Sequence, residues 1–383
     1  MNNKSPKVEF VITARPSWSR VKKLISEFAK IEGESALSIT LMGSAVSDKY
    51  GDIQNQMPKE IEVSSFSTFR GNESLSSIAN TSIQGAQALS YKWAVRRPES
   101  VLIVADRTET LGVSLAAATM QIPLIHLQGG ETSGSIDDKI RGANSKLADY
   151  HLTTNETTAN NLIEIGEDKR NIAIIGCPSI DIVQEKLSNK TNIHLKSSNY
   201  GGLGAEFETD SSYGIILFHP DTYAFHENLE WTNNLVNLVQ KSQLNWFWFW
   251  PNIDFGGESI SKLLRTKREL LDFTKVRFLK NIHPEEFINL CINSKILVGN
   301  SSFGIREASY IGLPVINLGH RQKGRQRSDN VLDIDIPNDI TGHVEEYSLR
   351  RFQQSKIYGD GNAAELGALA LSNWRPRLKS SGA

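Results

Sequence analysis

The chain has 383 residues, of which 42 are basic and 43 acidic, so its formal net charge at pH 7 is −1. A balanced charge argues against a nucleic-acid or membrane-surface partner. This length is too great for one comfortable hydrophobic core, so we expect two domains.

The cysteine content and the apolar segments bear on where the protein works. Two cysteines, Cys177 and Cys291, are too few for a disulfide framework and fit a reducing compartment. No apolar segment has the length of a membrane span, and the apolar run near the N-terminus is too short for a signal peptide. We therefore expect a cytoplasmic protein without a membrane partner.

Short β-rich runs alternate with helical patterns along the whole chain, which is typical of parallel sheets built from βαβ units. The expected strands of the first half cover residues 8–13, 37–43, 100–105, 122–128, 150–154 and 171–176. Those of the second half cover residues 213–219, 244–251, 276–280, 294–300 and 313–319. The fold class predicted from this pattern is α/β, with two Rossmann-like, doubly wound domains facing across a cleft.

A polar stretch rich in Gly and Ser, from Lys186 to Tyr213, separates the two series of strands and has the composition of a linker or surface loop. We place the domains at residues 1–185 and 186–383. A helical pattern at 363–374 ends the chain, and it could pack on either domain.

Ligands of open parallel sheets bind at the carboxyl ends of the strands, so the residues that follow the strands are the candidates for chemistry. Arg15 follows the first strand and could donate to a phosphate, although the Pro16 beside it equally suits an ordinary helix start. Asp106 follows the strand at 100–105 and could either cap the next helix or face a ligand.

The stretch LQGGETSGSIDDKIRG, residues 127–142, is rich in acids. Ser135 and Asp138 have the spacing of a capping box, and Asp137 and Arg141 have that of a helical ion pair. Glu131 fits this structural interpretation less well, because it follows two glycines in a turn that would allow close approach of a ligand.

The histidines give little reason to expect a metal. His219 ends the strand at 213–219, but a lone histidine is commonly a structural residue. The eight histidines form no HxH or HExxH pattern, so we expect no metal site and no cofactor.

The strongest local pattern lies at residues 294–330. Ser301 and Ser302 are expected to open a helix that contains Glu307, and hydroxyls and free N–H groups at a helix start bind anions. Glu307 could accept hydrogen bonds from a ribose diol. The following strand leads into a basic loop that could neutralise phosphates and contains His320, Arg321, Lys323, Arg325 and Arg327. The sequence has no P-loop motif, and the combination suggests a bound nucleoside diphosphate.

These segments together resemble the UDP-N-acetylglucosamine 2-epimerase family, in particular the hydrolysing branch used in making sialic and related nonulosonic acids. The segments that carry the resemblance run in the family's order along nearly the whole chain: ARPSWSR, ADRTET, HLQGGETSGSIDDKIRG, GCPSID, FHPDT, WPNIDFGG and GNSSFGIREASYIGLPVINLGHRQKGR. The resemblance implies the glycosyltransferase-B type of fold, a UDP-sugar substrate, no cofactor, and a homodimer or homotetramer.

The resemblance also implies roles for individual residues. Asp106, Asp137 and His219 match family positions implicated in catalysis, and Glu131, which follows the two glycines, is the further acid that we expect to be catalytic. The residues expected to bind substrate are Arg15, Ser19, Gln128, Arg141, Asn252, Ser301, Ser302, Glu307 and Arg321. The N-terminal domain would carry most of the catalytic acids and the C-terminal domain would bind UDP.

Two positions depart from the family. Gln128 stands where the family often has Glu, and Gly142 stands where it often has His. A glutamine cannot act as a general base. A scheme that needs a carboxylate at this position therefore fails for this chain or moves the role to another acid, for which Glu131 is the candidate.

The activity implied by the resemblance is elimination of UDP from UDP-GlcNAc to give a 2-acetamidoglucal, followed by addition of water with inversion at C2 to give free ManNAc. The nearest alternatives are a non-hydrolysing 2-epimerase and a hydrolysing 2-epimerase of UDP-2,4-diacetamido-2,4,6-trideoxyglucose. A glycosyltransferase of the same fold class and a non-catalytic UDP-sugar sensor are the others.

Overall fold

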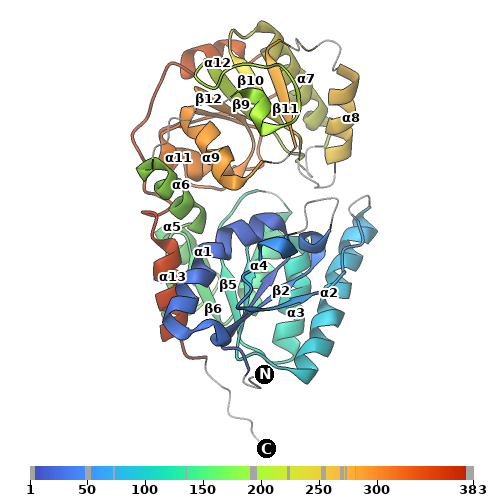
Figure 1. Ribbon diagram of the computed structural model, residues 1–383, viewed down its shortest axis with the longest axis vertical. Coiled ribbons are helices and arrows are strands. Elements are labelled where there is room, and N and C mark those ends of the chain that lie inside the picture. Colours follow the sequence, from blue (N-terminus) through green and yellow to red (C-terminus); the bar gives the residue numbers. More distant parts are fainter. Residues whose placement is uncertain are drawn as a thin grey trace, which may run out of the picture. The chain divides into compact units, whose positions relative to one another are not determined.

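A computed structural model describes residues 5–376 apart from 48–52, 72–73, 135, 190–195, 222–224, 252–255, 268–270, 272–273 and 281. The chain forms two compact units, shown in Figure 1. Unit 1 comprises Met1–Glu131, Asp137–Asp181 and Gly359–Ala383, and unit 2 comprises Thr132–Ile136 and Ile182–Tyr358. No described helix is long and apolar enough to cross a membrane.

Unit 1 is built on a seven-stranded sheet in the order β3-β2-β1-β4-β5-β6-β7, in which every neighbouring pair is parallel. The strands are β1 (Val8–Ile12), β2 (Leu37–Leu41), β3 (Glu62–Ser65), β4 (Val101–Val104), β5 (Leu124–Leu127), β6 (Tyr150–Thr153) and β7 (Ile172–Ile174). The helices are α1 (Arg15–Glu32), α2 (Leu75–Val95), α3 (Thr108–Thr119), α4 (Asp137–Leu147), α5 (Glu156–Glu164), α6 (Pro178–Ser188, which runs on into unit 2) and α13 (Ala363–Asn373).

Unit 2 has a second seven-stranded sheet in the order β14-β13-β12-β9-β10-β11-β8, parallel except for β8. Its strands are β8 (Leu203–Gly204), β9 (Tyr213–Leu217), β10 (Asn245–Phe249), β11 (Val276–Leu279), β12 (Ile296–Gly299), β13 (Val315–Leu318) and β14 (Val331–Ile334). Its helices are α7 (Phe225–Lys241), α8 (Gly257–Lys267), α9 (Pro284–Asn293), α10 (Ser302–Ile305), α11 (Glu307–Ile311) and α12 (Thr341–Tyr347).

Both sheets carry helices on both faces, which is why their central strands are mostly apolar, with buried exceptions such as Glu9 in β1 and His126 in β5. In β1, Phe10 and Ile12 pack in the core shared with α1 and α13, while Val11 packs in the core shared with α2 and α3. In β10 the alternation is aromatic: Trp246 and Trp248 enter one core of unit 2, and the neighbouring Phe side chains enter the other. The predicted fold class of two doubly wound α/β domains is confirmed.

Three strands, β3, β8 and β14, were not expected from the pattern. All three are edge strands, and each contains residues that are exposed or partly exposed. An edge strand buries less apolar surface than a central one, so its sequence lacks the continuous apolar run that marks a buried strand.

The C-terminal helix α13 belongs to unit 1, where it packs beside α1. Asp181 fixes the start of this helix: its two carboxylate oxygens accept hydrogen bonds from the backbone N–H groups of Ala363 (2.9 Å) and Ala364 (2.7 Å). Asp181 is itself buried. The last acid of the GCPSID segment therefore caps a helix that follows it by more than 180 residues.

We predict that Asp181→Ala lowers the free energy of unfolding by about 1–2 kcal/mol, because two buried N–H groups lose their acceptors. Urea unfolding followed by circular dichroism measures the change. Glu365→Gln is the matched control, since Glu365 is an exposed acid in the same helical turn. An equal loss in both variants would show that charge near the helix terminus, and not the cap, is responsible.

Candidate active site

The strand order reverses between β1 and β4 in unit 1 and between β9 and β12 in unit 2. Such switch points are where doubly wound sheets bind ligands, at the carboxyl ends of the strands. The predicted site residues that the structure describes lie after these strands or after their neighbours β5 and β13, so each unit has its own cluster.

The chain turns sharply at the ends of β4 and β5. Ala105 and Gln128, the residues just beyond these strands, have φ values of 58° and 65°. This left-handed conformation costs a residue with a side chain about 1–2 kcal/mol, so surrounding contacts must hold it. Both residues still extend the ladder, because their N–H groups donate to Leu127 O (2.9 Å) and Leu152 O (2.8 Å).

A buried polar array holds the Ala105 turn. The carbonyl oxygen of Ala105 accepts hydrogen bonds from His126 Nε2 (2.8 Å) and Asn144 Nδ2 (3.4 Å). A carbonyl can only accept, so the His126 proton is on Nε2 and Nδ1 accepts from Ser145 Oγ at 3.0 Å. Complete burial lowers the pKa of His126 to about 3, so the ring is neutral near pH 7.

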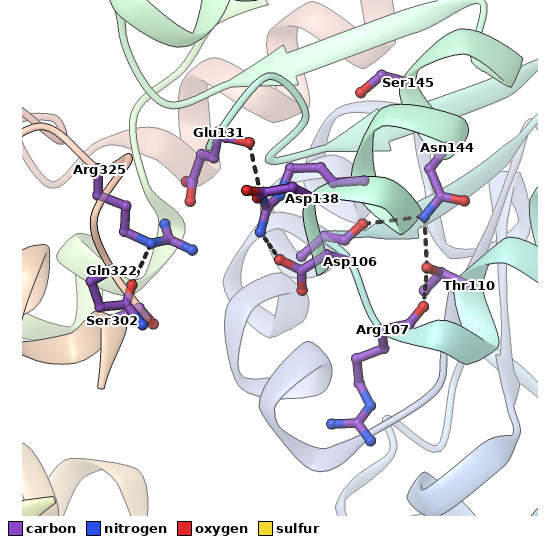
Figure 2. Close-up of polar contacts among 12 residues, drawn as sticks. Asp106, Arg107, Thr110, Glu131, Asp138, Asn144, Ser145, Ser302, Gln322 and Arg325 are labelled. Atoms are coloured by element: carbon purple, nitrogen blue, oxygen red, sulfur yellow. Dashed lines mark hydrogen bonds and ion pairs between the residues drawn. The ribbon is translucent and has the colours of Figure 1, made fainter. Parts of the chain in front are cut away.

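The same array reaches the start of α3. Asn144 Nδ2 donates to Thr110 Oγ1 (2.7 Å), which donates to the carbonyl oxygen of Arg107 (2.5 Å), as drawn in Figure 2. Asn144 Oδ1 accepts from Ser114 Oγ (2.7 Å). The β4–α3 turn that carries Asp106 is thereby fixed from both sides.

Arg141 lies at the centre of the acidic cluster of unit 1. Its side chain is only 2% exposed. Nη2 forms an ion pair with Asp106 Oδ2, while Nη1 donates to Asp138 Oδ1 (2.6 Å) and to the carbonyl oxygen of Glu131 (2.8 Å). Asp106, Glu131 and Asp138, the three residues that contact Arg141, are labelled in Figure 2. Asp137, the first residue of α4, precedes Asp138 in the same turn.

The Gly-Gly pair before Glu131 has a structural explanation that differs from the expected one. Gly130 has φ +77°, and a Cβ there would lie 2.2 Å from the carbonyl oxygen of Thr158. Asn161 Nδ2 donates to Gly130 O at 2.8 Å. The close approach is therefore to α5 of the protein itself, which fixes the turn that presents Glu131, a residue 7% exposed.

Gln128 is buried beside a cysteine. Its Nε2 lies 3.3 Å from Cys177 Sγ, and its Oε1 accepts no hydrogen bond from any described residue. A Gln in this position offers an amide and no titratable group.

Residues Thr132–Ile136 belong to unit 2, so the chain leaves unit 1 after Glu131 and returns at Asp137. Within unit 2 this short segment pairs with the basic loop after β13: Thr132 Oγ1 donates to Gly324 O (2.9 Å), and Gly324 N donates to Ser133 O (3.3 Å). The two candidate acids Glu131 and Asp137 are therefore the residues that flank the segment.

Arg15 and Ser19 lie in the first turns of α1, directly after β1. Ser19 Oγ donates to Pro16 O at 2.9 Å, within its own helix. The start of α1 is therefore an ordinary helix start with a proline in its first turn, and it also lies at the switch point of unit 1.

In unit 2, Asn300 organises the switch point. Its Oδ1 accepts from His219 N and its Nδ2 donates to His219 O, both at 2.8 Å, so the carboxamide pairs with His219 as a neighbouring peptide group would. The carbonyl oxygen of Asn300 accepts from Gln322 Nε2 (3.0 Å) and Arg321 Nη1 (3.3 Å). His219 and Arg321 are thus brought to one residue at the end of β12.

The helix expected from Ser301 through Glu307 is interrupted at Arg306. Ser301 caps α10 by accepting from Phe303 N (3.3 Å), α10 ends at Ile305, and Glu307 begins α11. Arg306 has ψ −70°, and its carbonyl oxygen accepts from Ser309 Oγ (2.6 Å). This side-chain hydrogen bond accompanies the break, because Ser competes with the backbone for such carbonyls.

Glu307 is 6% exposed, and its Oε2 accepts no hydrogen bond from a described residue; Arg306 Nε lies 3.8 Å away. A buried carboxylate oxygen that accepts no hydrogen bond from the described residues can accept one from a hydroxyl group of a ligand. Ser302 Oγ accepts from Arg306 Nη2 at 3.1 Å.

Two residues singled out from the sequence, Asn252 and Ser135, lie outside the described residues. His126, Asn144 and Asn300, which hold the turns, are not among the site residues predicted from the sequence. The available signal was a histidine within an otherwise apolar strand, and on α4 a set of polar residues at the helical spacing 141, 144 and 145 that faces the sheet.

We predict that His126 makes the protein sensitive to acid. The unfolded chain protonates this histidine as the pH falls through about 6.5, whereas the folded protein does so only near pH 3, so stability present above pH 6.5 is lost as the pH falls. Between these values the free energy of unfolding of the wild type should fall more steeply than that of His126→Gln, by about 1.4 kcal/mol per pH unit.

Urea unfolding at several pH values from 7 to 4 measures the two slopes. His343→Gln, at an exposed position of α12, is the control and should keep the slope of the wild type. Parallel curves for the wild type and His126→Gln would contradict the prediction.

The chain is similar to known proteins along most of its length. Residues 29–371 match the family model described as UDP-N-acetylglucosamine 2-epimerase. A protein of Legionella pneumophila subsp. pneumophila named UDP-N,N'-diacetylbacillosamine 2-epimerase (hydrolyzing) is 31% identical, with 94% of this chain and 93% of that protein covered. The GDP/UDP-N,N'-diacetylbacillosamine 2-epimerase (hydrolyzing) of Campylobacter jejuni is 27% identical over 91% of this chain and 89% of its own length.

The crystal structure of UDP-GlcNAc 2-epimerase from Neisseria meningitidis bound to UDP-GlcNAc has the same fold, with a TM-score of 0.76 and 18% identity. The likeness covers 95% of this chain and 99% of that chain. Fold, order of motifs and family match agree, and the chain belongs to the UDP-N-acetylglucosamine 2-epimerase family of enzymes.

Proposed function

We propose that the protein is a hydrolysing 2-epimerase, which converts a UDP-2-acetamido sugar and water into UDP and the free sugar inverted at C2. The observation that carries this proposal is the acidic cluster at the ends of β4 and β5, where Asp106, Glu131 and Asp138 surround the buried Arg141. The hydrolysing branch is supported by two relatives, aligned over about nine-tenths of the chain, whose names specify hydrolysis.

The chemistry of the substrate explains the need for both acids and cations. The proton at C2 of a 2-acetamido sugar has no adjacent carbonyl carbon, so a carboxylate alone cannot remove it. The C1–O bond must break ahead of proton removal, so that positive charge develops at C1 while UDP departs. A carboxylate near the ring then stabilises this charge and accepts the C2 proton, leaving a glycal.

We assign the carboxylate roles to Asp106 and Asp137, with Glu131 as the third acid. Asp106 stands at the switch point of unit 1, and Asp137 begins α4 beside the Arg141 partner Asp138. Gln128 supplies no base, which makes the remaining acids responsible for both proton transfers. In the second half-reaction, water adds to C1 and a proton returns to C2 from the opposite face.

The departing diphosphate needs cationic and N–H donors. We assign this role to Arg15, Arg321, Ser301 and Ser302, with His219 beside Arg321 at Asn300. Glu307 is assigned to the ribose hydroxyls, because its buried carboxylate has an oxygen that accepts no hydrogen bond from a described residue. The role of Asn252 in substrate binding rests on the resemblance alone.

We propose UDP-N,N'-diacetylbacillosamine, a 2,4-diacetamido-2,4,6-trideoxy sugar nucleotide, as the preferred substrate. Both relatives carry that sugar in their names. The free product would then be of the kind used in making nonulosonic acids. UDP-GlcNAc, which would give free ManNAc, is the comparison substrate.

The test is incubation of each UDP-sugar with the protein in D₂O without an acceptor, followed by NMR. Free sugar deuterated at C2, together with UDP, is the expected result. A UDP-sugar epimerised at C2 and still joined to UDP would indicate a non-hydrolysing enzyme. An unchanged UDP-sugar, for both substrates, would contradict the proposed activity and leave a transferase or a sensor.

Asp106→Asn and Asp137→Asn should each lower kcat by about 10²- to 10⁴-fold, the usual contribution of a general acid or base. The dissociation constant for UDP should change little, since UDP is assigned to other residues. Steady-state kinetics and calorimetric titration with UDP measure the two quantities. Full activity of either variant would remove that residue from the mechanism.

Gln128→Glu tests whether the amide has a specific function. Activity that is kept or raised is expected if Gln128 only lines the site, since the Cys177 thiol can donate to a carboxylate oxygen in place of the amide contact. Activity is measured by UDP release. A collapse of kcat in a variant with the melting temperature of the wild type would show that the amide itself is required.

A further inference from the structure

The geometry points to Arg141 as a positioning residue, which acts on the reaction through the Asp106 carboxylate instead of binding the substrate. This inference rests on the proposed function, because it concerns the acid assigned to that reaction. It changes the role expected for Arg141 from the sequence, that of a substrate-binding residue.

The burial of Arg141 supports this role. A guanidinium group removed from water needs anionic or carbonyl partners, because desolvation of an unpaired charge is costly. Arg141 is 2% exposed, while its two acidic partners Asp106 and Asp138 are 20% and 30% exposed. The carboxylates therefore reach toward the surface of unit 1 while the cation between them stays inside.

The Nη groups of Arg141 donate to protein oxygens. Nη1 has two N–H groups, and it makes two hydrogen bonds, to Asp138 Oδ1 and Glu131 O. Nη2 is paired with Asp106 Oδ2. An arginine that clamped a diphosphate would need an accessible fork of donors, whereas this fork is used on three segments of unit 1.

Those three segments are the ones that carry the candidate acids. Asp106 ends β4, Glu131 ends the β5 turn, and Asp138 lies next to Asp137 in the first turn of α4. Glu131 and Asp137 also flank the Thr132–Ile136 segment that belongs to unit 2. Arg141 contacts the Asp106 carboxylate itself, whereas it contacts Glu131 at the backbone carbonyl oxygen, so Asp106 is the assigned acid that its guanidinium group orients.

A double-mutant cycle between Arg141 and Asp106 tests this inference, with kcat and the dissociation constant for UDP measured separately. Arg141→Lys keeps a charge but loses the fork, and we expect kcat to fall about ten-fold or more with the UDP dissociation constant within about two-fold of the wild type. In the Asp106→Asn background, Arg141→Lys should lower kcat by less than about two-fold, because the group through which it acts is already lost.

If the double variant loses kcat by the product of the factors measured for Arg141→Lys and Asp106→Asn alone, the inference is overturned. A rise in the UDP dissociation constant that accounts for the loss in kcat/KM would overturn it as well. Arg97→Met is the matched control: Arg97 also donates to backbone carbonyls in unit 1, at Met120 and Gln121, but stands at the other end of α3 and should keep the wild-type kcat. Loss of kcat in that control would show that the effects arise from general destabilisation.

If Arg141→Lys does not fold, Asp138→Asn replaces it in the cycle, because Asp138 is partly exposed and acts on the same guanidinium group. We expect a smaller loss of kcat, again absent in the Asp106→Asn background. If Asp138→Asn lowers kcat by the same factor with and without Asp106→Asn, the inference is overturned in this cycle too. The wild type is assayed first. If it converts neither UDP-sugar, the proposed function itself is contradicted, and this outcome is distinct from any result of the cycle.

Discussion

A buried guanidinium group is tolerable in a protein only where the surrounding chain supplies oxygens for its donors. In this protein that requirement falls on Arg141, whose partners come from the ends of two adjacent strands and from the first turn of a helix. These segments cannot move independently without leaving a charge unpaired. The acidic cluster of unit 1 is consequently rigid without being inaccessible, since the side chains of Asp106 and Asp138 remain partly exposed.

The backbone beneath the cluster is held by neutral groups. Ala105 is kept in a left-handed conformation by two hydrogen bonds to its carbonyl oxygen, one of them from a histidine that burial keeps uncharged. A neutral ring is suited to this function because it adds no charge beside Asp106. In unit 2 the carboxamide of Asn300 has the same kind of role at His219. Both units therefore place a side-chain hydrogen bond where a sheet ladder ends.

Much of the fold could be predicted from the sequence because buried parallel strands are apolar on both faces. Edge strands such as β3 could not, since exposure removes that pattern. The helix through Glu307 was expected to be continuous, but it breaks at Arg306, whose carbonyl oxygen accepts a hydrogen bond from Ser309 Oγ. These differences arise where tertiary contacts outweigh local propensity.

The site shows the same limit. Strand ends identify Asp106 and His219 as candidates, but the spacing of charges on α4 directs attention to Asp137 as the ion-pair partner of Arg141. The ion pairs in the structure run to Asp138 and to Asp106, which precedes Arg141 by 35 residues. Partners so distant in sequence follow from the fold, and no local spacing encodes them.

In the proposed reaction the C1–O bond breaks first, with the help of carboxylates, and water then adds to the sugar carbon C1. The alternative is attack of water on phosphorus. The most direct measurement is turnover in H₂¹⁸O with mass spectrometry of the released UDP. Cleavage at C1–O leaves both phosphates with their original oxygens, so UDP of unchanged mass is the predicted result. UDP that carries one ¹⁸O atom would mean that water attacks phosphorus, and would contradict the account.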